Sequence, residues 1–157
     1  MMRRFEAVSK EEFSKRLDIS YYDNIKMPER KTKNSAGYDI SICKGEVIKC
    51  GETKVFATGI KAKMENDEFL AIFIRSSLGI KKGLILANNV GIIDSDYYNN
   101  LDNEGHIMIA LTNISKTDVE LSDGERVAQG IFLKYEVVSD EKEIKARRLG
   151  GIGSTNI

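Results

Sequence analysis

The stretch Asn88–Tyr97 reads Asn-Asn-Val-Gly-Ile-Ile-Asp-Ser-Asp-Tyr and joins an apolar run to two closely spaced carboxylates. Val90–Ile93 has the composition of a short strand, interrupted by one glycine, and Asp94 follows at its end. Because successive side chains of a strand face opposite ways, an extended backbone would put Asp94 and Asp96 on one face. A carboxylate at the end of a rigid strand suits a general base. Asp-Ser-Asp is also common in polar turns, so both interpretations stay open on these ten residues alone.

Short β-like runs separated by turn signals lie on both sides of this stretch. The expected strands are Tyr38–Ile42, Thr53–Thr58, Ile60–Met64, Phe69–Ile74, Leu84–Leu86, Val90–Ile93, Ile107–Thr112 and Arg126–Lys134. Between them lie turn signals such as Lys44-Gly45, Asn66-Asp67 and Asp123-Gly124. Many short strands at this spacing predict an all-β fold, a sandwich or a jelly-roll-like β-barrel. With no repeat or linker in the sequence, residues 1–157 are expected to form a single domain.

The N-terminal residues 1–30 are expected to form a short helical extension to this β domain. Ser9 and Glu12 have the spacing of a capping box, which predicts a short helix ending near residues 18–22. Pro28, the one proline of the chain, favours an extended link to the first strand.

The composition is that of a soluble globular protein, with 41% hydrophobic and 31% charged residues. Lys+Arg and Asp+Glu are equal at 24 each, so no net positive field favours nucleic acid or an anionic membrane as a partner. Apolar runs are all shorter than a membrane span, and the charged N-terminus does not resemble a signal peptide. We therefore expect a cytoplasmic protein, in which Cys43 and Cys50 are reduced thiols and not a disulfide.

The single histidine, His106, limits the chemistry that the chain can perform. A histidine-rich metal site is excluded, and His106 with the two cysteines lacks the spacing of a zinc site. A lone histidine on a strand is more often a surface or cross-strand partner than half of a catalytic pair. Any chemistry is therefore expected to rest on carboxylates, with a metal ion brought by the substrate.

Two further polar clusters could bind phosphate. Arg75-Ser76-Ser77-Leu78-Gly79 follows an apolar strand and offers a guanidinium beside two hydroxyls. Residues 146–157 form a glycine-rich arm, in which glycines flanked by arginine, serine and threonine could let backbone N–H groups approach a phosphate. By itself, a solvated strand end explains the first cluster equally well, and a frayed tail explains the second better than a binding loop does.

Taken in order, the clusters resemble the five motifs of the trimeric dUTPase family. Those motifs are matched by Ala36–Ile40, Arg75–Gly79, Asn88–Tyr97, Gly124–Gln129 and Arg147–Thr155. Each motif is short, but five in the same order over about three-quarters of the chain are specific. The resemblance implies a β jelly roll that assembles as a homotrimer, with three active sites between subunits and motif five supplied by a neighbouring chain. The implied reaction is hydrolysis of dUTP to dUMP and pyrophosphate.

The resemblance also implies a role for individual residues. Asp94 would deprotonate the water that attacks the α-phosphorus, and Asp39 would hold waters on a Mg²⁺ ion chelated by the phosphates. Asn88 would recognise uracil, and Tyr97 would pack under the deoxyribose and leave no room for a 2′-hydroxyl. The remaining implied substrate-binding residues are Arg75, Ser76, Ser77 and Gln129 at the phosphates, and Arg147, Ile152, Gly153, Ser154 and Thr155 in the closing arm.

The sequence departs from the family pattern at three places. Ile152 stands where the family has an aromatic residue over the uracil, which predicts weaker substrate retention, by about 1 kcal/mol, and not lost chemistry. Residues 98–104 form a polar insertion before Gly105, where the family turns tightly. Ser77 stands where dUTPases commonly have glycine.

The third departure keeps dCTP deaminase, a sister family on the same fold, as the main alternative. Deaminases use a glutamate on the following strand as a proton shuttle, and Ala110 occupies that position here. A methyl group cannot carry a proton, which makes the deaminase the weaker hypothesis. A catalytically silent nucleotide-binding regulator is a further alternative, although it would have no need of Asp94. A purely structural jelly roll would leave the order of the five motifs unexplained.

Overall fold

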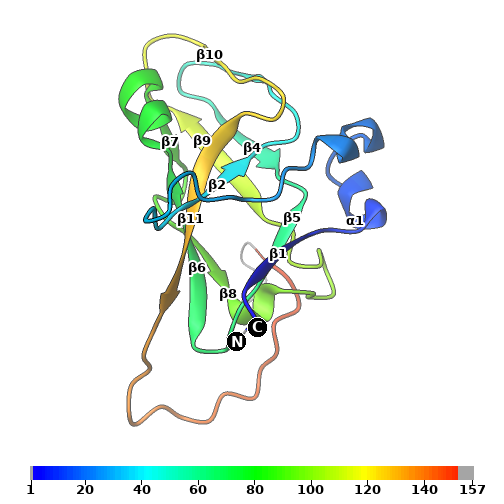
Figure 1. The fold of residues 1–157 in the computed structure, drawn as a ribbon, viewed down its shortest axis with the longest axis vertical. Coiled ribbons are helices and arrows are strands. Elements are labelled where there is room, and N and C mark those ends of the chain that lie inside the picture. Colours follow the sequence, from blue (N-terminus) through cyan, green and yellow to red (C-terminus); the bar gives the residue numbers. More distant parts are fainter. Residues whose placement is uncertain (1, 152–157) are drawn as a thin grey trace.

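The structure, a computed structural model, describes residues 2–151, which form four β-sheets and a few short helical segments (Figure 1). The strands are β1 (Arg4–Ala7), β2 (Tyr38–Ser41), β3 (Val47–Ile48), β4 (Thr53–Ala57), β5 (Ile60–Lys63), β6 (Glu68–Ile74), β7 (Leu84–Leu86), β8 (Gly91–Asp94), β9 (Met108–Asn113), β10 (Val119–Glu120) and β11 (Arg126–Lys134). The helical segments are α1 (Lys10–Ser14), the 3₁₀ helices η1 (Ile19–Asn24) and η3 (Ser95–Tyr97), and the π-helix η2 (Ser77–Lys82).

Antiparallel pairing organises the two larger sheets, in the orders β2-β11-β6-β8 and β4-β9-β7. Two strand pairs, β1-β5 and β3-β10, complete the arrangement. The main core is built from their inward-facing aliphatic side chains, of which Ile40, Leu70, Leu84 and Leu111 are fully buried. This arrangement confirms the expected all-β, jelly-roll-like fold with a short N-terminal helix.

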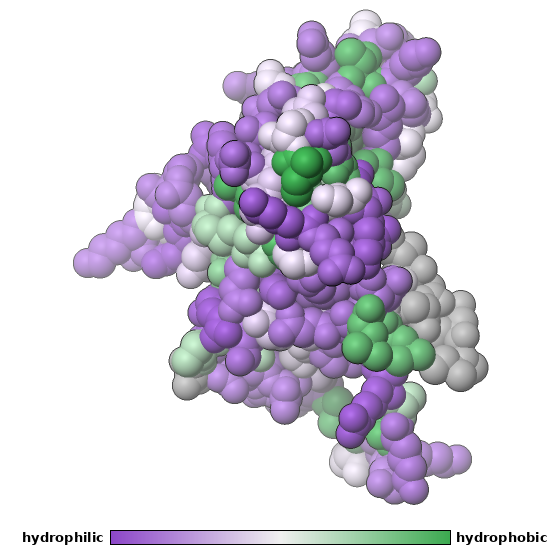
Figure 2. All heavy atoms as spheres, turned by 90° about the vertical axis from the view of Figure 1, so that its right-hand side faces the viewer, coloured by the Kyte–Doolittle hydropathy of each residue, from purple (hydrophilic) through white to green (hydrophobic). Residues whose placement is uncertain are grey.

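A second, smaller core joins the N-terminal segment to the sheets. Val8, Phe13 and Cys43 are buried together, and the ring of Tyr22 meets Phe13 edge-on at 5.3 Å. Helix α1 begins at Ser9, whose hydroxyl accepts a hydrogen bond from the Glu12 N–H (3.1 Å), as the sequence predicted. The face of the molecule on this side is mainly hydrophilic, with small, separate apolar patches (Figure 2).

His106 lies in the interior, not at the surface or in a cross-strand pair as we expected. Its Nε2 accepts a hydrogen bond from the Gly59 N–H at 2.9 Å, and its Nδ1 lies 3.4 Å from Oε1 of the buried Glu12. Burial lowers the pKa of His106 below its ordinary value, although the hydrogen bond to Glu12 opposes this shift. The histidine is thus a structural link between α1 and the start of β9.

Several elements were not predicted from the sequence. Strand β1 lies inside the segment that we expected to be helical, and it pairs with β5 from Arg4 opposite Lys63 to Ala7 opposite Ile60. The two-residue strands β3 and β10 and the π-helix η2 were also missed. Strands β7 and β11 have the predicted bounds, and the other predicted strands differ by one residue at one or both ends.

Both cysteines are free thiols, as expected: Cys43 is buried and Cys50 is exposed. Burial raises the pKa of Cys43 to about 11, so its thiol stays protonated and unreactive. Within residues 2–151 the structure contains no helix that is long and apolar enough to span a membrane.

Candidate active site

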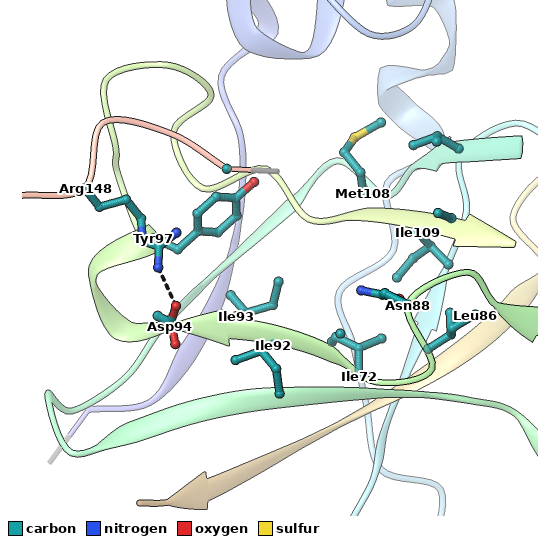
Figure 3. Close-up of a pocket in the computed structure, with 14 residues that line it drawn as sticks. Ile72, Leu86, Asn88, Ile92, Ile93, Asp94, Tyr97, Met108, Ile109 and Arg148 are labelled. Carbon is teal, nitrogen blue, oxygen red and sulfur yellow. Dashed lines mark hydrogen bonds and ion pairs between the residues drawn. The ribbon is translucent and has the colours of Figure 1, made fainter. Parts of the chain in front are cut away.

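A cavity of about 350 Å³ lies at the end of β8, between β6 and β9 (Figure 3). Most of its wall is aliphatic; the lining residues are Val55, Ile72, Leu86, Asn88, Gly91, Ile92, Ile93, Asp94, Tyr97, Met108, Ile109, Ala110, Arg148 and Gly151. We call this the apolar cavity. It brings together all the members of the Asn88–Tyr97 motif to which we assigned a role.

Asp94 is the last residue of β8 and the N-cap of η3, so strand pairing fixes its backbone opposite Phe69. Its side chain is 45% exposed, which leaves the carboxylate accessible to water. One oxygen, Oδ2, is paired with the Arg148 guanidinium (Figure 3). Position and exposure both suit a general base.

The backbone after Asp94 does not stay extended as we expected, because Ser95–Tyr97 form the 3₁₀ helix η3. The polar-turn interpretation of this segment is therefore correct for its local structure. Asp94 and Asp96 nevertheless converge on one partner, because Arg148 also binds Asp96 through Nε at 2.6 Å from Oδ1. The turn thus places two carboxylates around a single guanidinium.

Tyr97 forms one end of the apolar cavity and is 8% exposed. Its hydroxyl donates to the His106 carbonyl at 3.2 Å and accepts from Asn103 Nδ2 at 2.7 Å. Burial raises the pKa of this phenol, which therefore stays neutral. The Arg148 guanidinium lies 5.8 Å from the ring centre, and a Cβ at Gly151 would lie 2.7 Å from the ring, so only glycine lets the arm pass so close.

Asn88 is exposed at the mouth of the apolar cavity, in the turn between β7 and β8. Asn89 holds this turn with a positive φ of 60°, which asparagine tolerates better than most residues. At Gly91 a Cβ would lie 2.9 Å from Cβ of Ile72, so glycine permits close contact between β8 and β6 beneath the cavity. The turn and the glycine together position Asn88 at the mouth of the apolar cavity.

A second cavity, of about 420 Å³, collects the phosphate-binding residues predicted from the second and fourth motifs. It is lined by Lys31, Ser35, Gly37, Asp39, Arg75, Ser76, Ser77 and Gln129. We call this the polar cavity. Lys31 and Ser35 were not predicted, because no motif marks the loop that carries them.

Asp39 is the centre of the polar cavity and is held by two arginines. Oδ2 lies 2.7 Å from Nη1 of Arg126, and Oδ1 lies 3.5 Å from Nε of Arg75. Arg75 also donates to the Arg126 carbonyl at 3.2 Å, which ties β6 to β11 at this point. These contacts orient the carboxylate and both guanidinium groups before any ligand is bound.

An irregularity in β11 puts Arg126 and Gln129 on the same side as Asp39. The pairing with β2 shifts between Arg126 and Ala128, so that Val127 is an extra residue and is buried like Ala128. In a regular strand, residues three apart face opposite sides, and the bulge removes this conflict. Gln129 then lies opposite Asp39 and beside Gly37, where a Cβ would lie 2.4 Å from its Oε1.

Ser76 and Ser77 stand where β6 ends and η2 begins, and both are exposed. Within residues 2–151 neither hydroxyl takes part in a hydrogen bond, so both are available to a ligand beside Arg75. The backbone turns here through hydrogen bonds from the Leu78 and Gly79 N–H groups to the Arg75 carbonyl, both at 3.0 Å. The turn directs the two hydroxyls away from the core.

In the single chain the two cavities have separate linings, with no residue in common. The described part of the arm, residues 146–151, returns to the apolar cavity through Arg148 and Gly151. Arg147, which we expected to contact the substrate, is exposed and lines neither cavity. Arg148 was missed because no sequence signal indicates its pairing with Asp94. The predicted residues Ile152, Gly153, Ser154 and Thr155 lie outside the described residues.

The carboxylates of the described chain do not form a metal cage of their own. Within residues 2–151 no group of three or more histidine, cysteine or acidic side chains is arranged to hold a metal ion. Asp39 is the one carboxylate in the polar cavity, and its two oxygens already face arginines. This donor set fits only an ion that arrives with its own ligands and meets Asp39 through water.

Comparisons with known proteins agree with this geometry. The family model described as dUTPase matches residues 23–156. The deoxyuridine 5′-triphosphate nucleotidohydrolase of Lactococcus lactis is 46% identical over 140 residues, covering 87% of this chain and 93% of that protein. The chain belongs to the dUTPase family.

Solved structures support the same membership. The crystal structure of the dUTPase from Streptococcus mutans superposes with a TM-score of 0.74 at 40% identity, covering 87% of this chain and 98% of the other. A dUTPase from phage phi11 of Staphylococcus aureus shares the fold, with a TM-score of 0.71 at 18% identity and coverage of 93% and 97%. The resemblance inferred from the five motifs is therefore confirmed.

Proposed function

We propose that this dUTPase-family chain hydrolyses dUTP to dUMP and pyrophosphate, as a cytoplasmic homotrimer that needs Mg²⁺. The observation that carries the proposal is the pair of complementary cavities. One is apolar and contains a single water-accessible carboxylate, Asp94, and the other contains an arginine, a lysine, hydroxyls and an amide. A nucleoside triphosphate needs both, because its base and sugar are recognised by shape and its phosphates by charge.

In the apolar cavity, Asp94 acts as the general base. It removes a proton from a water molecule, whose oxygen forms a bond to the α-phosphorus while the bond from that phosphorus to the bridging oxygen breaks. Pyrophosphate leaves with the electron pair of that bond. Asn88 at the cavity mouth donates to and accepts from the uracil edge, and the Tyr97 ring closes the space beside C2′. The 45% exposure of the Asp94 side chain supports this role.

In the polar cavity, Arg75, Ser76, Ser77 and Gln129 bind the phosphates and stabilise the charge that develops on them. Asp39 would hold, through water, a Mg²⁺ ion that arrives with the phosphates. When bound, this ion supplies positive charge to the phosphate oxygens. The pairing of Asp39 with Arg75 and Arg126 supports an outer role, since its oxygens already have partners.

The arm completes the site over the bound nucleotide. Arg147, Ser154 and Thr155 contact the γ-phosphate, while Ile152 and Gly153 cover the base. Arg148 docks the arm at Asp94 and Asp96 in the free chain. Arg147 is exposed in the free chain, and this exposure leaves it available to a nucleotide held by another subunit.

Because the two cavities of a chain share no lining residue, we propose that the apolar cavity of one subunit meets the polar cavity of its neighbour. Three equivalent sites then form around the threefold axis of a closed ring. This arrangement predicts that two inactive variants can complement each other. Asp94→Asn damages one cavity and Arg75→Ala the other, so a mixed trimer can contain sites in which both cavities are intact.

The test mixes the two variants in equal amounts under conditions that allow subunit exchange, and follows pyrophosphate release from dUTP. Each site needs an intact half from two different chains, so about one half times one half, roughly a quarter, of the sites should be active. Each variant mixed with itself is the control. If activity stays at the level of the separate variants while exchange is demonstrated, the shared site is wrong.

The deaminase alternative is tested by product analysis. Ala110 lines the apolar cavity and stands at the sequence position where a deaminase needs a proton-shuttling glutamate. We expect pyrophosphate from dUTP with Mg²⁺ and no ammonia from dCTP. Release of ammonia would assign the chain to the other activity. Tight dUTP binding without any product would favour the silent regulator.

A further inference from the structure

The insertion at residues 98–104 lies between η3 and β9 and contacts three separate parts of the molecule. Its Glu104 accepts a hydrogen bond from the Ser9 N–H at 3.0 Å, at the start of α1. Its Asp102 N–H donates to the Leu149 carbonyl of the arm at 3.1 Å. Its Asn103 contacts the Tyr97 hydroxyl. A polar loop tip in solvent would have no reason to make these contacts.

The contact with Tyr97 is shielded from water. Asn103 is 7% exposed and Tyr97 is 8% exposed, and Nδ2 lies 2.7 Å from the phenol oxygen. The same hydroxyl donates to the His106 carbonyl at 3.2 Å. A buried polar group that loses its partner is costly, because water does not replace the lost hydrogen bond. The phenol is therefore held at its far end by two partners.

The orientation of the Asn103 amide is determined by its surroundings. Its Oδ1 accepts hydrogen bonds from Asn100 Nδ2 at 2.7 Å and from the Gly105 N–H at 3.0 Å. Both neighbours are donors, so the oxygen must face them and the NH₂ group must face the phenol. Asn100 in turn donates to the Tyr97 carbonyl at 2.8 Å, so the loop holds both the backbone and the side chain of Tyr97.

We propose that Asn103 is a positioning residue that fixes the Tyr97 ring and thereby sets selectivity for deoxyribose over ribose nucleotides. This rests on the proposed function, in which the ring closes the space beside C2′. A ring excludes a 2′-hydroxyl only if it cannot tilt away from it. Two hydrogen bonds at the phenol oxygen prevent this tilt, and Asn103 supplies the one that comes from the insertion.

The test is a double-mutant cycle of Asn103→Ala and Tyr97→Phe, read as the ratio of kcat/KM for dUTP to kcat/KM for UTP. Loss of one buried hydrogen bond should lower this ratio by about 10-fold in Asn103→Ala. Tyr97→Phe keeps the ring and removes only the hydroxyl, so it should lower the ratio to a similar extent. In the Tyr97→Phe background, Asn103→Ala should change the ratio by less than about 2-fold, because its target is already absent.

Asn99→Gly is the matched control. It truncates another asparagine of the same insertion, whose Oδ1 accepts from Lys61 Nζ, and glycine tolerates its positive φ of 56°. The ratio should not change in this variant. Thermal unfolding of all variants reports whether the loop only stabilises the fold.

Two outcomes of the double-mutant cycle overturn the proposal. The first is that Asn103→Ala lowers kcat/KM for dUTP and UTP equally and leaves their ratio unchanged, which would show a structural role only. The second is that the effects of the two substitutions add in the double variant.

If Asn103→Ala does not fold, Tyr97→Phe alone still tests whether a hydroxyl that faces Asn103 and His106 controls the ratio. If Tyr97→Ala also keeps the wild-type ratio while dUTP is hydrolysed, the role of Tyr97 itself is wrong. A wild-type chain without dUTP hydrolysis would instead refute the proposed function.

Discussion

The apolar cavity and the polar cavity are built in opposite ways. The apolar cavity has aliphatic walls, and its tyrosine and glycines are fixed by close packing, so it can select a ligand by shape. The polar cavity is lined by charged and hydroxyl side chains, several of them exposed, and it can select a ligand by charge. A substitution in the first should therefore alter proton transfer and selectivity, whereas one in the second should alter binding of the phosphates and stabilisation of the charge that develops on them.

The largest expected effect comes from Asp94→Asn, which tests whether the apolar cavity supplies the chemistry. The amide has the same shape but cannot take a proton, so turnover of dUTP should fall by about 10²–10⁴-fold. Nucleotide binding, measured by calorimetry with a non-hydrolysable analogue, should stay nearly unchanged. Asp96→Asn is the matched control, since Asp96 shares Arg148 with Asp94 but stands outside the cavity lining. Equal losses in both variants would contradict the assignment of the base.

A smaller effect is expected from Arg148→Ala, which tests whether the arm belongs to the apolar cavity. Arg148 makes two ion pairs, with Asp94 and Asp96, in a partly exposed position. Such pairs are each worth up to about 1 kcal/mol, so KM for dUTP should rise by roughly 3–10-fold with little change in kcat.

The control for this prediction is Lys145→Ala, which removes a cation just before the arm whose side chain is 82% exposed. It should leave both kinetic constants unchanged. If Arg148→Ala raises kcat instead, the ion pair with Asp94 opposes catalysis and does not dock the arm.

The smallest effect is expected from His106, the structural link between α1 and the start of β9. Burial lowers the pKa of His106 in the folded chain below its ordinary value of 6.5. At a pH between the pKa of His106 in the folded chain and its pKa in the unfolded chain, the unfolded chain binds more protons. The contribution of His106 to the free energy of unfolding is therefore complete above about pH 6.5 and is lost as the pH falls below it. Thermal unfolding of the wild type should show this decline. In His106→Gln the decline should be flatter, and an equal decline in both would assign it to other groups.

Parts of this arrangement could be predicted from the sequence because their causes are local. The β-like run Arg126–Lys134 after the turn signal Asp123-Gly124 and the hydroxyl at Ser9 predict β11 and the start of α1 correctly. The order of the motifs also gives the family. Other parts depend on contacts between residues far apart in sequence, which no local pattern indicates. Examples are the pairing of β1 with β5 and the contact of Arg148 with Asp94.

The bulge at Val127 illustrates a second limit of prediction. Regular alternation along β11 would place Arg126 and Gln129 on opposite faces, and only the shifted pairing with β2 reveals that both face Asp39. The segment after Asp94 also differs from its local pattern: an extended backbone was expected there, and Ser95–Tyr97 form the 3₁₀ helix η3. In both cases the local sequence pattern indicates a strand, but contacts with other parts of the chain determine the backbone conformation that forms.

The two thiols differ in a way that has a practical use. Cys43 is buried with a pKa of about 11, whereas Cys50 is exposed. Because the chain has two cysteines in all, a maleimide dye should label each chain once, at Cys50. Chains labelled with a donor dye and chains labelled with an acceptor dye would then report subunit exchange by energy transfer, without any engineered cysteine.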